Sequence, residues 1–356
     1  MTSNDKPPAP GQRRALVDRL AAGIQPRGEV VVNAAMLGSV GVGKTSLLAS
    51  MYERFSHVIG PVDLDIRADP DTSRSMNSTI ATLKELPTAV RVTAGVPGTG
   101  KVRHYRFDIG ARGRAAAFTL RFTDFPGAYM LPEHYADREK VQEALVSSDV
   151  LLVAIDTPAM IEHSGRFHDI INTPLTVLDE VKRLLVESAE PRLIILTLLK
   201  AESYLTSPAA IDKLAKLVTE KYRPLLDHIG GEGVRHRVGC VLASVQTVGS
   251  VRLLSVDPAN PREPIFHYRA TGIGASYDPV DTDQPLRYLL RFVINKYRAD
   301  GRPLWRSIWE RMNGVDGRLV AAVDTFARGC KTTDGFAVLQ DHPLLQTPTP
   351  WYMSNQ

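Results

Sequence analysis

The sequence has few cysteines and no long apolar run, and each absence narrows the class of protein. Only two cysteines occur in 356 residues, Cys240 and Cys330, whereas a secreted domain of this size often has more and pairs them. The longest apolar runs, at 150–155 and 193–199, are far shorter than the ~20 residues that cross a bilayer. The polar, proline-rich N-terminus also lacks the apolar core of a signal peptide. We therefore expect a cytoplasmic protein with reduced thiols, no transmembrane segment and apolar runs that form buried strands.

The composition is that of an ordinary globular protein. Hydrophobic residues make up 44% and charged residues 23%, and the formal net charge of +4 comes from 43 basic and 39 acidic residues. This mild excess is compatible with a basic patch but does not require nucleic acid or a membrane as partner. The histidines show no paired metal-ligand spacing, and no Ser/His/Asp arrangement stands out. Composition therefore directs attention to local motifs.

The stretch 36–52 joins an apolar run to a glycine-rich turn and then to a helical pattern. It fits the phosphate-loop motif G-x-x-x-x-G-K-[ST], placed between a strand and a helix as that motif requires. Backbone N–H groups and the helix N-terminus favour phosphates there, with Lys44 at the β- and γ-phosphates and Thr45 on Mg²⁺. The motif indicates a nucleoside triphosphate without identifying its base. The expected phosphate-binding residues are Gly38, Ser39, Val40, Gly41, Val42, Gly43, Lys44, Thr45, Ser46 and Gly127.

Strand-like and helix-like patterns alternate along most of the chain. They predict an α/β, three-layer P-loop NTPase sandwich, whose mostly parallel sheet has helices on both faces. Two alternating runs around a glycine turn within 103–124 add one antiparallel hairpin strand. The expected parts are a tail and short helix (1–28), the P-loop domain (29–300) with a long, partly mobile loop (60–100) and an inserted hairpin (251–284), and a C-terminal extension (301–356).

A second motif would supply the acid that holds Mg²⁺. Asp124-Phe125-Pro126-Gly127 follows the second strand of the predicted hairpin, where the carboxylate of Asp124 would hold the metal through water. Gly127 has no side chain, so its backbone N–H could approach a γ-phosphate. The competing acid is Asp156, which ends an apolar strand as the Walker B acid of many ATPases does. We rank Asp124 first because Thr157 and Pro158 do not provide the catalytic acid that such ATPases place next.

The order of these motifs resembles that of Ras-like GTPases of the translation-factor-related (TRAFAC) class. Those proteins carry D-x-x-G after an antiparallel strand pair, and "DFPG" matches it. The resemblance covers residues 29–300 and implies GTP and GDP as ligands with Mg²⁺ as cofactor. Within that class, the 60–100 region, the "DFPG" loop and "PLRYLL" at 285–290 resemble bacterial double-GTPase-type proteins.

The resemblance also points to base-binding residues. The family's N-K-x-D element is matched by Leu199-Lys200-Ala201-Glu202, in which Lys200 would lie along the base plane and Glu202 would accept from guanine. The asparagine is absent, which weakens the assignment to guanine. "LASVQ" resembles the family's S-A-x loop, and we expect its residues Ala243 and Ser244 to lie at the base.

Hydrolysis needs an oriented water and positive charge at the γ-phosphate. The family's glutamine after D-x-x-G is replaced by Ala128, so we assign the catalytic role to Lys44 with Glu133 or His134. Val40 stands where small G proteins often keep glycine, and its branched side chain would crowd an arginine from a partner. We expect slow intrinsic turnover and no Ras-style activator.

The 60–100 region should supply a threonine that completes the Mg²⁺ shell, as in other order–disorder switches. Thr72 and Thr79 are the candidates, and Thr79 is preferred. Arg67 and Arg74 could act as internal arginine fingers. For each of these residues taken singly, we favour an ordinary place in a solvated loop.

The segment 286–311 is basic and interleaved with aromatic residues. That composition suits a nucleic acid or membrane surface, but we favour a packed final helix with solvated arginines. The leading hypothesis is a Mg²⁺-dependent GTPase switch whose states a protein effector or regulator reads through 60–100 and 125–140. The alternatives are a P-loop ATPase that uses Asp156, and a nucleotide-binding scaffold with little turnover.

Overall fold

The structure is a computed structural model that describes residues 30–58, 64–88, 101–113, 116–130, 138–260, 263–300 and 318–347. The expected tail and short helix at 1–28 lie outside these residues, as do Glu133 and His134. Among the described residues, no helix combines the length and the apolar character needed to cross a membrane.

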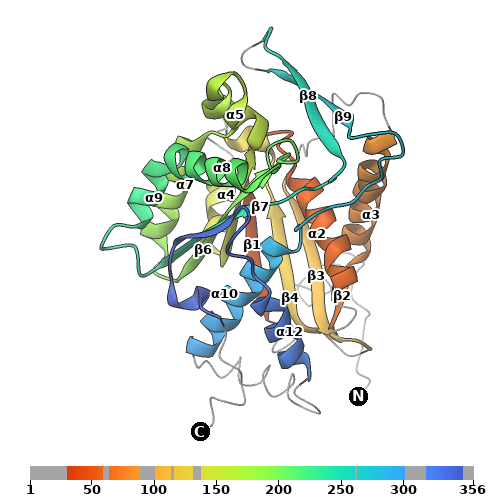
Figure 1. Ribbon diagram of the computed structural model, residues 1–356. Helices are drawn as coiled ribbons and strands as arrows, with labels where there is room; N and C mark the ends of the chain where they lie inside the picture. Colours follow the sequence, from red (N-terminus) through yellow and green to blue (C-terminus); the bar gives the residue numbers. More distant parts are fainter. Residues whose placement is uncertain are drawn as a thin grey trace, which may run out of the picture.

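One eight-stranded sheet organises the chain, in the spatial order β10-β7-β6-β5-β1-β4-β3-β2 (Figure 1). Five neighbouring strands, from β7 to β4, are parallel, whereas β3 and β10 run antiparallel to their neighbours. The strands are β1 (Val31–Leu37), β2 (Leu64–Ala68), β3 (Arg103–Ala111), β4 (Ala116–Asp124), β5 (Val150–Asp156), β6 (Arg192–Leu199), β7 (Val238–Ser244), β8 (Val251–Asp257), β9 (Ile265–Ala270) and β10 (Phe336–Gln340).

Helices cover both faces of this sheet, which confirms the three-layer α/β prediction (Figure 1). Helices α2, α3, α10 and α12 pack on one face, and α4, α5, α7, α8 and α9 pack on the other. The helices are α2 (Lys44–Val58), α3 (Pro70–Glu85), α4 (Arg138–Val146), α5 (Thr157–Gly165), α6 (His168–Ile171), α7 (Pro174–Glu187), α8 (Pro208–Lys221), α9 (Arg223–Ile229), α10 (Gln284–Asp300) and α12 (Arg318–Arg328), with short 3₁₀ turns at Leu86–Thr88, Gly127–Met130 and Pro343–Leu345.

The central strands read as continuous apolar runs because both of their faces are buried. On β5, Leu152 contributes to the core under α2, while Leu151 and Val153 contribute to the core on the opposite face. Parallel strands covered on both sides have this character. The same sheet places the carboxyl ends of β1, β4, β5, β6 and β7 at one edge, which is where ligands bind in α/β folds.

Both predicted hairpins are present. Strands β3 and β4 pair antiparallel, with Tyr105 opposite Phe122. Within the insertion predicted at 251–284, β8 and β9 form a separate two-stranded sheet. Figure 1 shows this hairpin at the top of the molecule, between α5 and α3.

The prediction of a long loop at 60–100 is wrong for its described part, residues 64–88. This part forms β2 and the 16-residue helix α3, whose Met76, Ile80 and Leu83 join the core. Asp69 caps the helix by accepting from the backbone N–H of Thr72 at 3.0 Å, with proline in the first turn. An N-cap aspartate followed by proline is a helix-start signal, which the many polar residues of this helix obscured.

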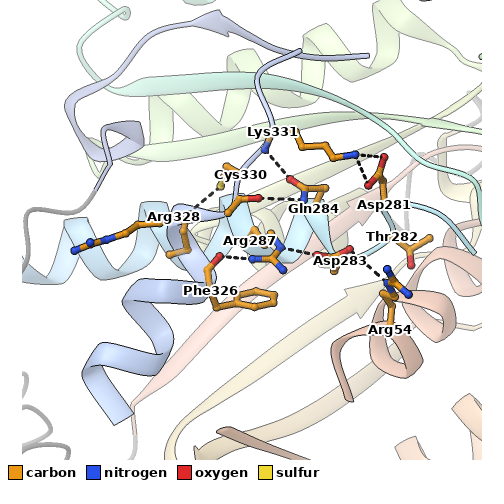
Figure 2. Close-up of polar contacts among 12 residues, drawn as sticks. Arg54, Asp281, Thr282, Asp283, Gln284, Arg287, Phe326, Arg328, Cys330 and Lys331 are labelled. Carbon is orange, nitrogen blue, oxygen red and sulfur yellow. Dashed lines mark hydrogen bonds and ion pairs between the residues drawn. The ribbon is translucent and has the colours of Figure 1, made fainter. Parts of the chain in front are cut away.

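The chain beyond residue 300 completes the sheet, because β10 pairs antiparallel with β7. Two arginines of α10 satisfy the last carbonyls of α12, which helix ends otherwise leave unpaired, and Figure 2 shows the first of them, Arg287, at Phe326. Arg287 donates to Phe326 O at 2.7 Å, and Arg291 donates to Ala327 O at 2.9 Å. In its described part, the basic segment that begins at 286 is therefore a packed helix, as favoured from the sequence.

The segment before α10 joins the C-terminal part to α2 (Figure 2). Asp283 pairs with Arg54 of α2 and with Arg287, and Thr282 donates to Ser50 O of α2 at 3.3 Å. Helix α2 begins in the phosphate loop, so the C-terminal part supports the helix that carries the candidate site.

Candidate nucleotide-binding site

The phosphate loop connects β1 to α2 and depends on its glycines. Gly38, Gly41 and Gly43 have φ angles of +143°, +73° and +110°, a region in which other residues are strained. The residue types of the motif therefore set the backbone path, and α2 begins at Lys44 with its N-terminus beside the loop. Such an arrangement favours an anion.

Lys44 is buried inside its own loop. Its ammonium donates to Gly38 O at 2.7 Å and to Ser39 O at 3.2 Å, and it lies 4.0 Å from Asp124 Oδ1. Burial lowers the pKa of Lys44, and the charge of Asp124 opposes that shift. The ammonium is thus held by weak carbonyl partners, which a phosphate could replace.

Asp124 ends β4 beside the phosphate loop. The parallel pairing of β4 with β1 sets Asp124 level with Met36, two residues before Gly38. Its Oδ2 accepts from the hydroxyl of Thr45 at 3.0 Å, while Oδ1 is buried with no hydrogen-bond partner in the part of the chain that the structure describes. Burial raises the pKa of Asp124, against the effects of Lys44 and Thr45.

A Mg²⁺ ion fits this pair of side chains. A hydroxyl and a carboxylate are hard oxygen groups of the kind that Mg²⁺ prefers, and the orphaned Oδ1 of Asp124 is a buried acceptor that needs a cation or a water. The structure thus brings together Thr45 and Asp124, which the sequence pairs only through motif order.

Gly127 packs directly on the phosphate loop. A Cβ placed on Gly127 would lie 1.9 Å from Val40 N and 2.2 Å from Ser39 C, so only glycine allows this approach. Phe125, two residues earlier, is buried in the core and anchors the "DFPG" loop. The two loops expected at the phosphates are therefore in contact.

The remaining loop residues have different surroundings. Val40 is 59% exposed at the tip of the loop, whereas Val42 is in the core. Ser46 is buried, and the buried hydroxyl of Ser39 has no hydrogen-bond partner among the described residues. The side chain of Val40 is exposed at the phosphate loop. There it would obstruct an arginine that a partner brings to this loop from solvent.

Asp156, the competing metal acid, is occupied elsewhere. Its Oδ1 accepts from Ala159 N at 2.9 Å and caps α5, and its Oδ2 pairs with Lys200 Nζ at 2.6 Å. Asp124 therefore fits the metal position better than Asp156.

The expected base-binding residues lie at the ends of β6 and β7. Lys200 has a φ of +56° and directs its ammonium to Asp156. Glu202 is buried, and its Oε1 accepts from Val248 N at 3.3 Å and Gly249 N at 3.5 Å. Burial raises the pKa of Glu202, and these backbone bonds oppose that shift. Glu202 thus ties the loop after β6 to the loop after β7.

Ala243 and Ser244 are both buried at the end of β7. The hydroxyl of Ser244 donates to Gly335 O at 2.8 Å, just before β10. The side chain of Ser244 thus holds the C-terminal strand β10. The role of Ala243 and Ser244 at a base stays a prediction.

The switch threonine is not in a loop as expected. Thr79 lies on the buried side of α3, so a contact with the metal would need this helix to move. The alternative, Thr72, donates to Asp69 Oδ2 at 2.7 Å and accepts from Arg106 N at 3.0 Å. Thr79 as a metal ligand remains a prediction, as do the roles of Glu133 and His134.

Sequence reasoning missed the contacts of the β8–β9 hairpin with the loop after β6. Leu253 N donates to Ser203 Oγ at 2.8 Å, and Lys200 Nζ lies 6.0 Å from the centre of the Phe266 ring. Ser203 and Phe266 belong to no motif, so only the tertiary structure could bring them together.

No curated protein matches the chain. Among solved structures, it is similar to the signal recognition particle receptor SRb-GTP/SRX complex from Chaetomium thermophilum (13% identity, 61% of this chain and 91% of that chain, TM-score 0.34). It is also similar to the S. cerevisiae Ski7 GTPase-like domain bound to GTP (16% identity, 65% of this chain and 45% of that chain, TM-score 0.33), so it spans less than half of that chain. A family model described as Double-GTPase 2 matches residues 34–238, more than half of the 356 residues. The chain belongs to the Double-GTPase 2 family, whose membership supports GTP binding.

Proposed function

We propose that the protein is a Mg²⁺-dependent GTPase switch with slow intrinsic turnover, regulated by a protein partner. The observation that carries this proposal is the meeting of Lys44, Thr45, Asp124 and Gly127, which come from two separate loops. Together they offer an ammonium, a hydroxyl, a carboxylate and a backbone without a side chain at one helix N-terminus.

The metal would be held by Thr45 and, through water, by Asp124. When bound, Mg²⁺ supplies charge neutralisation between the β- and γ-phosphates. The chain itself contributes the backbone N–H groups of the phosphate loop and the ammonium of Lys44, which exchanges its bonds to Gly38 O and Ser39 O for phosphate oxygens.

Slow turnover is proposed from the absence of a water-orienting side chain after Gly127. Ala128 can neither position water nor carry charge, and Glu133 and His134 are the remaining candidates. The exposed side chain of Val40 would obstruct an arginine supplied by a partner. A partner would then act by altering loop positions.

The switch is proposed from the contact between Gly127 and Val40. Because the two backbones already touch, a γ-phosphate that binds between them must change their spacing, and that change would pass to residues 125–140. The second surface that an effector would read, within 60–100, is then the packed helix α3 and not a loop.

Isothermal titration of GTP, GDP and ATP, each with and without Mg²⁺, tests the ligand. We expect Mg²⁺-dependent binding of GTP and GDP, with much weaker binding of ATP. Thr45→Asn should weaken the binding of GTP more than that of GDP. The hydroxyl is placed for a metal that would neutralise the β- and γ-phosphates, and GDP lacks the γ-phosphate. ATP binding without GTP binding would contradict the proposal.

Single-turnover hydrolysis tests the reaction, with Lys44→Ala as the inactive control. Slow but measurable release of phosphate above this control is expected. Turnover equal to the control would favour a nucleotide-binding scaffold, and rapid turnover of the isolated chain would contradict slow intrinsic hydrolysis.

A further inference from the structure

The β8–β9 hairpin is fixed onto the loop that follows β6. Leu253 N of β8 donates to Ser203 Oγ at 2.8 Å. Just before β8, Val248 N and Gly249 N donate to Glu202 Oε1. Three hydrogen bonds therefore join the loop that carries Lys200 and Glu202 to the hairpin and to the segment just before it.

One face of the hairpin turns toward this loop. Phe266 and Tyr268 are two positions apart on β9, so their side chains share a face. Phe266 packs with Ala159 and Phe167 of the α5–α6 region, with ring centroids of the two phenylalanines 6.2 Å apart. Its ring also lies 6.0 Å from Lys200 Nζ.

Tyr268 has a buried hydroxyl oxygen with no hydrogen-bond partner among the described residues. Burial raises the pKa of Tyr268, and the charges of Asp156 and Glu202 raise it further. Tyr268 shares its strand face with Phe266, whose ring lies 6.0 Å from Lys200 Nζ, and its hydroxyl stays a neutral phenol that can donate and accept. An unpaired buried hydroxyl costs ~1–3 kcal/mol, so a ligand that pairs it would remove this cost.

Glu202 is a poorer base-reading group than its motif position suggests. Its Oε1 is engaged by two N–H groups of the chain, which gives it a positioning role between two loops. Among the described residues, Tyr268 is one of several nearby polar groups without a partner, and it shares the face of β9 that carries Phe266.

We propose that the β8–β9 hairpin forms a wall of the base site and that Tyr268 is its specificity-determining residue, hydrogen-bonding the edge of the guanine base. The inference rests on the proposed GTP binding and deepens it. A site built to pair a polar group of one base rejects another base that leaves that group unpaired.

Tyr268→Phe removes the hydroxyl and keeps the ring. The dissociation constants of GTP and GDP should both rise about 3- to 10-fold, the effect of one hydrogen bond, because both nucleotides carry the same base. The dissociation constant of ATP, which is much larger, should not change. The preference for GTP over ATP, measured as the ratio of the two dissociation constants, should therefore fall by the same factor. Tyr105→Phe is the matched control, because Tyr105 also has a buried hydroxyl without a partner among the described residues but lies on β3, away from this loop.

The outcomes separate the two proposals. If the unmodified protein binds neither GTP nor GDP, the proposed function fails and this inference with it. If it prefers GTP and Tyr268→Phe leaves the preference unchanged, or weakens GTP and ATP equally, only the role of Tyr268 is overturned. Thermal unfolding of both variants shows whether a change in affinity reflects a lost contact or a damaged fold.

Discussion

The phosphate end and the base end of the candidate site are built in different ways. At the phosphate end, the backbone conformation shapes the site, and Gly38, Gly41 and Gly43 set that conformation within six residues of sequence. At the base end, side chains from β5, the loops after β6 and β7 and the β8–β9 hairpin meet across as many as 112 positions of sequence, from Asp156 to Tyr268. Local backbone geometry can be inferred from a motif, whereas such a convergence depends on the whole fold.

The two ends also use their acids differently. Asp124 keeps one buried oxygen without a hydrogen-bond partner among the described residues, with only the Lys44 ammonium 4.0 Å away, so this oxygen can still accept from a ligand or a metal-bound water. Asp156 and Glu202 are engaged by Lys200 and by backbone N–H groups of the chain. The phosphate end is therefore arranged for a ligand, while much of the polar chemistry of the base end holds the protein together.

Replacing each of these two aspartates, Asp124 and Asp156, by asparagine tests this difference between the two ends with the largest expected effect. Asp124→Asn should reduce Mg²⁺-dependent GTP affinity about 10- to 100-fold, the usual cost of losing a group that orients metal ligands. Asp156→Asn, the matched control, should leave the Mg²⁺ dependence intact, because its oxygens bind Lys200 and cap α5. Titration calorimetry across Mg²⁺ concentrations measures both. Loss of the Mg²⁺ response in Asp156→Asn alone would restore the ATPase-type alternative.

Gly127→Ala tests the contact between the two phosphate-end loops. The added Cβ would overlap Val40 N, so the loops must separate, at a cost of about 1–3 kcal/mol in the free energy of unfolding. GTP should be weakened more than GDP, because the displaced backbone faces the γ-phosphate in the proposed function. Denaturant unfolding and titration measure the two effects. Gly233→Ala is the control, since nothing lies within 4 Å of its Cβ position, and equal results for the two variants would contradict the close approach.

The contrast also explains how much the sequence could predict. The central strands of the sheet, both hairpins and the meeting of Asp124 with Thr45 followed from apolar periodicity and motif order, because strand register carries Asp124 to the level of Met36. The edge strands β2 and β10 did not. Helix α3 was missed because its buried residues are spaced among serines and threonines, although Asp69 and Pro70 gave a start signal.

The use of Glu202 could not be predicted from its motif. Its partner, the backbone N–H of Val248, is 46 residues away. Every residue except proline has such a group, so the residue type does not mark the position. Likewise, nothing in the spacing of Phe266 indicates that it lies over Lys200. Residues that act through backbone groups of distant segments leave no local pattern, which is why the base end needed the structure.

The smallest effect we expect is the part of the pH dependence that comes from His168 at the base end. His168 Nδ1 accepts from Asn172 Nδ2 at 3.1 Å, and Asn172 binds the backbone of Asp156 on both sides. Burial lowers the pKa of His168 to about 4 from 6.5; Lys221 adds to this shift and Asp169 opposes it. The folded state therefore favours the neutral ring, so its contribution is complete above pH 6.5 and is lost as the pH falls toward 4.

Between pH 7 and 5.5, this titration should lower the free energy of unfolding by about 1 kcal/mol. His168→Gln should remove that part of the slope, whereas His57→Gln, at an exposed position on α2, should not. Denaturant unfolding at both pH values measures the slopes. Equal slopes for the unmodified protein and His168→Gln would show that the His168–Asn172–Asp156 chain does not sense protons. Because no link of that chain reaches Lys44 or Asp124 in the described residues, the part of the slope that His168→Gln removes reports on the base end.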